Sequence, residues 1–149
     1  MTVQTSSGLT VSISTATPAT FDKVGYDAIT FTVVGEVVSV SEYGGTTEEV
    51  THTPLNTATV EKLKGAKNYG NLAMELGYDP SDAGQAILSD GFDGANDGVQ
   101  HSAKIEYSDG TIDYIYGYIF GYSKNPGAIG SVVSGASSIG INKPVVDGT

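Results

Sequence analysis

The sequence predicts a mainly β fold, a β-sandwich or partial barrel flanked by one short α-helix. Three observations lead to this prediction. The composition combines nine Tyr, no Trp and 20 Gly, which is typical of β-structure with many turns. Several segments alternate apolar and polar residues with period two, whereas one segment alone carries helix signals. With 149 residues, 39% of them hydrophobic, the chain is long enough for a single globular domain.

The first half of the chain begins with a Ser- and Thr-rich segment, residues 1–17, which is nearly uncharged. We predict an N-terminal arm there, either flexible or an extended strand that pairs with another subunit, followed by one domain over 18–149. Residues 18–25 are expected to form a turn. Residues 28–34 alternate Ile, Phe and Val with Thr and are predicted to be a strand, which Gly35 then interrupts as a bulge or bend.

A long polar span, residues 43–68, separates two β-like segments at 36–42 and 71–76. Ordering such a span costs backbone entropy that burial does not offset, so a compact domain rarely keeps one without a use. The span has almost no catalytic side chains, and its acidic residues precede its lysines. We therefore predict an arm that contacts a neighbouring subunit. The residues expected at this interface are Tyr43, Glu48, Glu49, His52, Pro54, Lys62 and Lys64.

The segments beside the arm have opposite faces of different character. In 36–42, Val38 and Val40 are expected on one face, with Ser39 and Ser41 on the other. In 71–76 the period-two spacing predicts an apolar face on one side of the strand and a polar face on the other. The apolar face comprises Leu72, Met74 and Leu76.

One helix is predicted after this strand. Asp79 is the expected N-cap and Pro80 the first helical residue, because both residue types favour these positions. Gly91 is the expected end. The face that should pack on the sheet comprises Ala83, Ala86 and Ile87.

The last third of the chain predicts three more strands. Residues 99–107 alternate apolar and polar side chains and are predicted to be a strand. Residues 108–110 are a Ser-Asp-Gly hairpin turn, and 112–122 are predicted to be the returning strand. The returning strand is apolar on both faces, so we expect it to be covered on both sides. A final strand is expected within 129–141. The tyrosine-rich face of the returning strand comprises Ile112, Tyr114, Tyr116, Tyr118, Phe120 and Tyr122.

The charge balance argues against a protein that binds nucleic acid tightly. There are 17 acidic and 7 basic residues, giving a net charge of −10, and every basic residue is Lys. Tight nucleic-acid binding relies on cationic side chains at phosphates and is not expected, although nucleic acid that passes without binding is compatible with this balance. Cysteine is absent. We find no signal peptide and no apolar run that would span a membrane, so we expect a soluble protein made in the cytoplasm.

The sequence offers no catalytic or cofactor-binding constellation, and we predict that the protein is not an enzyme. His52 and His101 are interpreted either as ligands of a metal site or as two structural histidines. Residues 90–98 are interpreted either as a Ca²⁺-binding loop or as an ordinary hydrated turn. The segment lacks the later bidentate Glu of an EF-hand, which favours the turn. No nucleophile elbow and no phosphate-binding Gly loop occurs. We therefore expect no metal and no cofactor.

Three stretches share an ordered string of motifs with one protein family: TPATFDKVGYDAITFTVVGEVVSVSEYGG, VTHTPLNTATVEKLKGAKNYGNLAMELGYDPSDAGQAIL and SVVSGASSIGIN. The order is an A/T-x-F/Y-D start, a G-E-V strand, T-H-x-x-L, K-L-K-G, and a strand leading into D-P-x-D-x-G-Q and a helix. On these residues the chain resembles the major tail tube protein of long non-contractile, siphovirus-type bacteriophage tails.

The resemblance implies a structural virion protein with a tail-tube-like fold. Hexameric rings would stack into a tube whose inner wall is a continuous β-barrel, a passive acidic conduit for ejection of double-stranded DNA. A neighbouring subunit would cover the tyrosine-rich strand, and Glu48 and Glu49 would face a neighbour's lysines. The implied lumen-facing residues are Ser39, Ser41, Asn71 and Glu75.

The resemblance also implies partners and a location. The partners are further copies of the chain, the tape measure and tail terminator proteins, and phage DNA that passes without specific binding, with no membrane insertion. The location is the tail tube of the virion, after synthesis in the host cytoplasm. No additional C-terminal immunoglobulin-like domain is expected. Two other functions compete: the tube subunit of a related contractile injection system, and a monomeric β-sandwich binding module for sugars or host surfaces.

Overall fold

The computed structural model of the chain describes residues 3–149. Strands make up 43% and helices 11% of it, and all strand pairs are antiparallel, which confirms the predicted mainly β class. The main sheet has the order β2-β1-β7-β8-β9-β6-β3, with β10 paired to β8. Its strands are β1 (Thr10–Ser14), β2 (Thr32–Val33), β3 (Val37–Val40), β6 (Asn71–Gly77), β7 (His101–Glu106), β8 (Ile112–Asn125), β9 (Ser134–Ile141) and β10 (Val146–Asp147). A separate two-stranded sheet joins β4 (Thr46–His52) to β5 (Glu61–Asn68), and the helices are α1 (Lys23–Asp27) and α2 (Ala83–Asp93).

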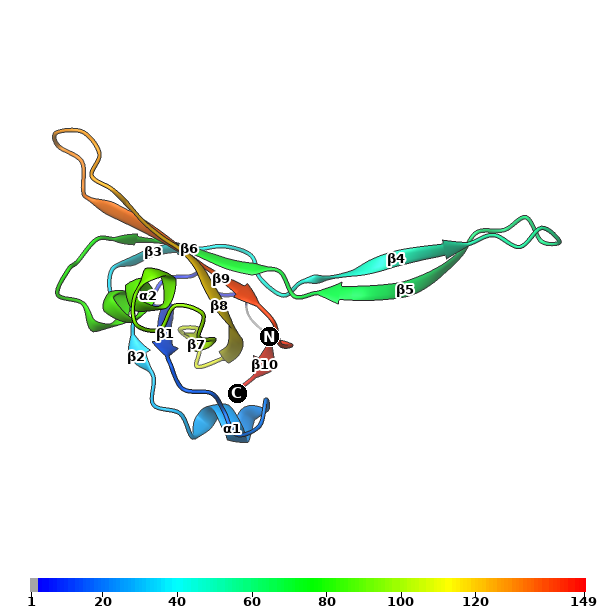
Figure 1. Cartoon of the computed structure of the whole chain (residues 1–149), viewed down its shortest axis with the longest axis horizontal. Helices are drawn as coiled ribbons and strands as arrows, with labels where there is room; N and C mark the ends of the chain where they lie inside the picture. Colours follow the sequence, from blue (N-terminus) through cyan, green and yellow to red (C-terminus); the bar gives the residue numbers. More distant parts are fainter. Residues whose placement is uncertain (1–2) are drawn as a thin grey trace.

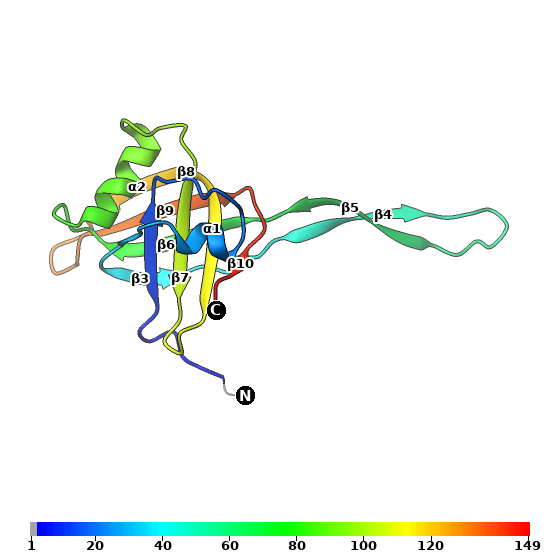
Figure 2. The same ribbon diagram turned by 90° about the horizontal axis from the view of Figure 1, so that it is seen from below.

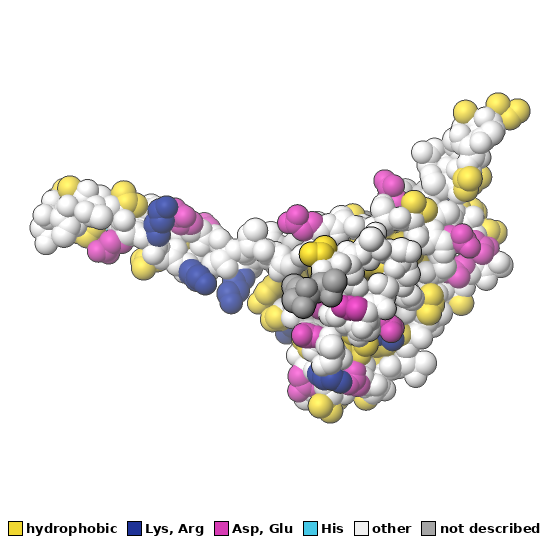
Figure 3. Space-filling view, turned by 180° about the vertical axis from the view of Figure 1, so that it is seen from behind, with side chains coloured by type: hydrophobic (Ala, Val, Ile, Leu, Met, Phe, Trp, Pro, Cys, Tyr) yellow, Lys and Arg dark blue, Asp and Glu magenta, His cyan; other side chains and the backbone are white. Residues whose placement is uncertain are grey.

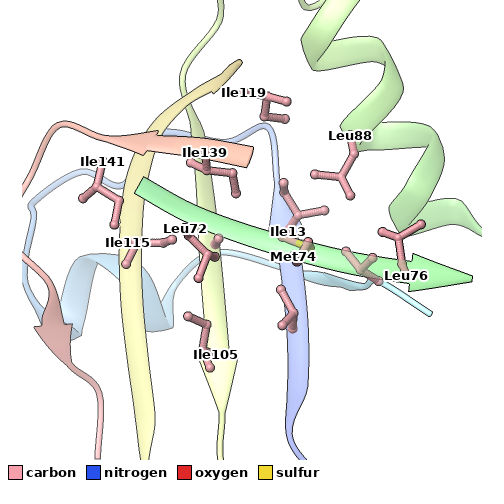
Figure 4. Close-up of a cluster of buried hydrophobic side chains, with 13 residues drawn as sticks. Ile13, Leu72, Met74, Leu76, Leu88, Ile105, Ile115, Ile119, Ile139 and Ile141 are labelled. Carbon is pink, nitrogen blue, oxygen red and sulfur yellow. The ribbon is translucent and has the colours of Figure 1, made fainter. Parts of the chain in front are cut away.

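Strand β8 folds the main sheet into two layers. Its first half, Ile112–Gly117, pairs with β7, and its second half, Gly117–Asn125, pairs with β9. The register shifts between Ile119 and Gly121, so that one extra residue bulges there. Consequently β9 and β6 cross over β1 and β7, and the core lies between these layers (Figure 4).

The core between the layers is made by alternate residues of facing strands. Leu72, Met74 and Leu76 of β6 are at most 2% exposed, as their period-two spacing predicts. Helix α2 closes one side of the core with the fully buried Leu88 (Figure 4). The other buried members are Val11, Ile13, Val34, Ala103, Ile105, Ile115, Ile119, Ile139 and Ile141.

Part of the predicted N-terminal arm belongs to the domain. Thr10–Ser14 is β1, which pairs with β2 on one side and β7 on the other. Val11 and Ile13 are each 1% exposed, and burying both outweighs the low hydrophobicity of their neighbours. The prediction of an arm over 1–17 is therefore wrong for these residues, and residues 1–2 lie outside the described part.

Helix α1 was not predicted, and its first residues fall in the turn that we expected over 18–25. Asp22 caps it, because its carboxylate accepts a hydrogen bond from the Gly25 N–H at 2.9 Å. Tyr26 of this helix stacks on Tyr114 at 4.9 Å between ring centroids, and Tyr116 completes the cluster. The chain's own α1 thus covers the tyrosine-rich half of β8, where we expected a neighbouring subunit. The strand predicted over 28–34 is reduced to β2.

Helix α2 starts three residues later than predicted. Asp82 is the N-cap, accepting from the Gln85 N–H at 2.9 Å, whereas Asp79 binds the Ser81 N–H and hydroxyl at 2.9 and 2.7 Å. The helix runs through Gly91 to a C-cap at Gly94. Its buried face is rotated from the predicted one and comprises Gly84, Gln85, Leu88 and Gly91.

Two bulges reverse predicted faces. Val38 is the extra residue of β3 and is 76% exposed, while Val40 packs on the core, so these two valines do not share a face. The bulge at Phe120 turns Tyr122 from the tyrosine-rich face to the core. Residues 126–133 lie outside β9 and form a projecting loop (Figure 1).

Candidate assembly interface

The β4–β5 hairpin, hereafter the arm, projects from the domain along the longest axis of the molecule (Figures 1 and 2). It occupies most of the polar span 43–68 that the sequence singled out. Its strands pair only with one another among the described residues. An isolated two-stranded hairpin is marginally stable in water, so the arm needs a surface to pack against.

The two faces of the arm differ in chemistry. One face carries Glu49, opposite Lys64, and Lys62, whose Nζ lies 4.0 Å from the Glu49 carboxylate. These side chains are 58–69% exposed at the contact, so this ion pair contributes little to stability. We expected Glu49 to meet a neighbour's lysine, and the structure shows it beside a lysine of its own arm.

The opposite face, hereafter the apolar arm face, is built on Val50 and Leu63, which lie directly opposite each other on β4 and β5. Val50 is 43% and Leu63 56% exposed. The predicted interface residue His52 lies on this face opposite Glu61, and Glu48 lies next to Val50 across from Gly65. Pro54 is at the tip. The face therefore offers an apolar centre flanked by acids.

The base of the arm is anchored by a tyrosine. The Tyr43 hydroxyl donates to Asp113 Oδ2 at 2.5 Å and also hydrogen-bonds the Tyr107 hydroxyl. Burial, and then these two hydrogen bonds, raise the pKa of Tyr43 above its usual value. Tyr43 was predicted at the subunit interface, but within the chain it is half-buried and ties the arm to β8 and to Tyr107, the residue that follows β7.

Glycines lie at the base of the arm, before β4 and after β5. Gly44, Gly45 and Gly70 have φ of +135°, +97° and +74°, a region that L side chains rarely adopt. A Cβ on Gly45 would collide with the Asn68 carbonyl and the Tyr69 backbone. These backbone conformations set the direction in which the arm leaves the domain.

The predicted lumen residues lie together on the outer face of β3 and β6. Ser39, Ser41, Asn71 and Glu75 are all exposed. Glu75 faces Ser39 across one strand pair and Ala136 across the other. This face continues over β9 and the second half of β8 as a shallow groove of about 380 Å³, which is lined by no residue of α1 or α2. Besides Glu75, the outward side chains that line this groove on β6, β8 and β9 are small: Ala73, Gly121, Ser123, Ala136 and Ser138.

The layer made by β3, β6, β9 and the second half of β8, hereafter the inner layer, has two free edges. Strand β3 pairs with β6 alone, and the part of β8 from Tyr118 to Asn125 pairs with β9 alone, among the described residues. Unpaired strand edges are templates for a strand from another chain. Phe120, 64% exposed, lies on the β8 edge.

The candidate metal residues are not brought together. His101 is buried in the core, where Nδ1 donates to the Val99 carbonyl at 2.8 Å and desolvation lowers the pKa of the ring. His52 is exposed on the arm. The first residues of the proposed Ca²⁺ loop belong to α2. Within 3–149, no group of three or more potential ligands could hold a metal ion, and no helix is long and apolar enough to cross a membrane.

No known protein family and no curated protein matches the sequence. Solved structures match the fold. A chain in the tail of an empty GTA particle, refined with C6 symmetry, superposes with a TM-score of 0.66 at 13% identity, over 96% of this chain and 97% of the other. The chain has a tail-tube-like fold.

The same tail-tube-like fold occurs in contractile machines. A chain from the PVC extracellular contractile injection system, in its sheath/tube terminator, gives a TM-score of 0.66 at 9% identity over 99% and 97% of the two chains. A chain from the anti-feeding prophage baseplate gives 0.63 at 11% identity over 96% and 94%. At these identities the likeness is one of fold.

Sequence reasoning missed one exposed element of this tail-tube-like fold. We predicted residues 129–133 of the loop 126–133 as the start of the last strand, yet Ile129 is fully exposed and Val132 81% exposed. The signal in the sequence was the pair Gly127 and Gly130, which adopt φ of +73° and +86° and mark a turn.

Proposed function

We propose that the chain is a structural subunit of a phage tail tube, without enzymatic activity, whose copies form hexameric rings that stack into a conduit for double-stranded DNA. The observation that carries the proposal is the tail-tube-like fold over nearly the whole chain, shared with a chain of a C6-symmetric GTA tail. The resemblance of the sequence to siphovirus-type tail tube proteins supports the non-contractile type.

The two free edges of the inner layer account for ring closure. In a ring, β3 of one copy lies beside the second half of β8 of the next, and the inner layers join into one barrel. Each junction satisfies backbone N–H and C=O groups that are unpaired in a single chain. A barrel has no edges, so closure also prevents indefinite lateral growth.

The arm accounts for the contacts between one ring and the next. It projects away from the domain, and its apolar face exposes Val50 and Leu63. Contacts between different surfaces of identical subunits propagate along an axis when they do not close on themselves. Stacking of rings through the arm therefore extends the tube.

The outer face of β3, β6 and β9 provides the wall of the conduit. It presents small and hydroxylated side chains with Glu75 as its carboxylate. The chain carries a net charge of −10 and no Arg, so the wall repels phosphates and has no group that binds them bidentately. DNA then passes without long-lived contacts.

A second function has specific support: the tube subunit of a contractile injection system, because the PVC and anti-feeding prophage chains share the fold. The two functions differ in the outer surface of the tube. A contractile tube carries a sheath around it, whereas the proposed tube is bare.

Electron microscopy of the concentrated protein, with sedimentation at low concentration, tests the proposal. We expect hollow tubes or stacked rings with sixfold symmetry and a continuous inner β-barrel. A protein that remains monomeric at every concentration and gains thermal stability from a sugar ligand would contradict the tube and favour a binding module.

A further inference from the structure

The loop 126–133, hereafter the apolar loop, is an exposed hydrophobic element with a defined shape. Ile129, Val132 and Val133 are 105%, 81% and 40% exposed. The Ser131 N–H donates to the Ala128 carbonyl at 3.0 Å, which closes a turn at the tip. Figure 3 shows hydrophobic side chains at this tip, beyond the body of the domain. Exposed branched side chains grouped on one turn indicate a contact surface.

The apolar loop and the arm lie at opposite ends of the molecule in both ribbon views (Figures 1 and 2). Each end exposes hydrophobic side chains that nothing else among residues 3–149 covers. Two unlike surfaces at opposite ends of one chain suit a head-to-tail contact between copies.

We propose that the apolar loop of one copy docks on the apolar arm face of a neighbouring copy, with Ile129 packing between Val50 and Leu63. This contact rests on the proposed assembly into a tube and names the two surfaces that one of its repeating interfaces uses. It covers the otherwise unsupported hairpin, and it removes the most exposed isoleucine of the chain from water.

The charges of the two surfaces are complementary. Lys124 is the one charged residue between Asp113 and Lys143, so the loop is uncharged except at its base. Within 3–149, Lys124 forms no ion pair, and its ammonium lies 4.7 Å from the centre of the Tyr78 ring. The apolar arm face carries Glu48 and Glu61 beside its centre. An apolar tip with one lysine behind it therefore meets an apolar centre flanked by carboxylates.

Cysteine pairing tests this contact without background, because the chain contains no cysteine. Leu63→Cys and Ile129→Cys are purified separately, mixed in equal amounts, assembled and then oxidised. We expect a covalent dimer on a non-reducing gel and a linkage between positions 63 and 129 by mass spectrometry. The matched control replaces Leu63→Cys with Thr51→Cys, which lies on the opposite face of the arm, and should give at least tenfold less dimer.

A second variant covers the case in which cysteine substitution itself impairs assembly. Ile129→Asp should raise the concentration needed for assembly by about tenfold or more, since a buried apolar side chain is replaced by a charge. Ala128→Asp, at the neighbouring loop position, is the control and should have a smaller effect.

The outcomes separate the contact from the proposed function. Normal tube formation by Ile129→Asp would overturn the docking contact and leave the proposed tube standing. Equal cross-linking of Ile129→Cys to Thr51→Cys and to Leu63→Cys would do the same. Failure of the unsubstituted protein to form any tube would instead overturn the proposed function, and the docking contact with it.

Discussion

Replacing Gln85 with leucine should destabilise the domain far more than its single, uncharged side chain suggests. Gln85 is 2% exposed and lies on the buried face of α2. Its Nε2 donates to the carbonyls of Gly35 at 3.1 Å and Gly77 at 2.8 Å. Its Oε1 accepts from the Asp79 N–H at 3.1 Å and from the Tyr122 hydroxyl at 3.3 Å. One amide thus joins four segments.

The expected loss follows from these partners. Leucine has a similar volume and leaves little cavity, but it satisfies none of the four groups. A buried polar group without a partner costs roughly 1–3 kcal/mol, and Tyr122 and Asp79 recover part of this through water. We therefore expect the Gln85→Leu variant to lose about 2–5 kcal/mol of unfolding free energy, a large share of the stability of a domain of this size.

Urea unfolding at neutral pH measures this loss, followed by far-UV circular dichroism. Ala86→Gln is the matched control, because Ala86 is the exposed neighbour in the same helix and should change stability by no more than about 0.5 kcal/mol. A Gln85→Leu variant within about 1 kcal/mol of the unsubstituted protein would refute the reasoning, since the amide would then not be holding these segments together.

Three further predictions concern the wall, the tyrosine cluster and the arm. Glu75→Gln should preserve tubes but slow DNA ejection from particles, because the wall loses a carboxylate; an unchanged ejection rate would remove Glu75 from the lumen. Burial raises the pKa of Tyr26 from 10.0 to about 12, so the folded state holds this proton more tightly. The contribution of Tyr26 to stability should be constant below about pH 10 and fall as pH rises from about 10 to about 12. Tyr26→Phe, which also removes a buried hydroxyl without a partner, should reduce the fall in stability over this range as measured by urea unfolding. Gly45→Ala should reduce tube yield while leaving the unfolding midpoint of the domain nearly unchanged, since its Cβ collides with the opposite strand at the base of the arm; normal tubes would show that the arm direction is not set there.

Period-two patterns predicted the strands whose burial alternates strictly. Leu72, Met74 and Leu76 are all in the core, because β6 itself contains no bulged residue. In β3 the bulged Val38 itself was assigned to the wrong face, and in β8 the prediction was wrong beyond Phe120, since one bulged residue shifts the alternation of the strand. Local sequence does not fix where such a residue falls.

Competition between similar signals explains the helix errors. Asp79 and Asp82 are both good N-caps, and the contacts of Asp82 with Gly35, 47 residues earlier, favour the second. Helix α1 has five residues, too few for a periodic pattern to appear.

The candidate site was predicted in part. Length and polarity identified the arm, and alternation placed Ser39 and Glu75 on one outward face, as the structure has them. The anchoring role of Tyr43 was not predictable, because its partners Tyr107 and Asp113 are more than 60 residues away in sequence. The apolar loop was missed because branched residues in a Gly-rich run resemble an edge strand.

The path of β8 through both layers has a mechanical consequence. A pull along this strand loads its hydrogen bonds to β7, β9 and β10 in shear, so that they must break together instead of one after another. If force on the inner edge reaches Tyr118–Asn125, the covalent backbone passes it directly to Ile112–Gly117, beneath α1. The two layers therefore yield as one body, and a bending load is spread over the whole domain.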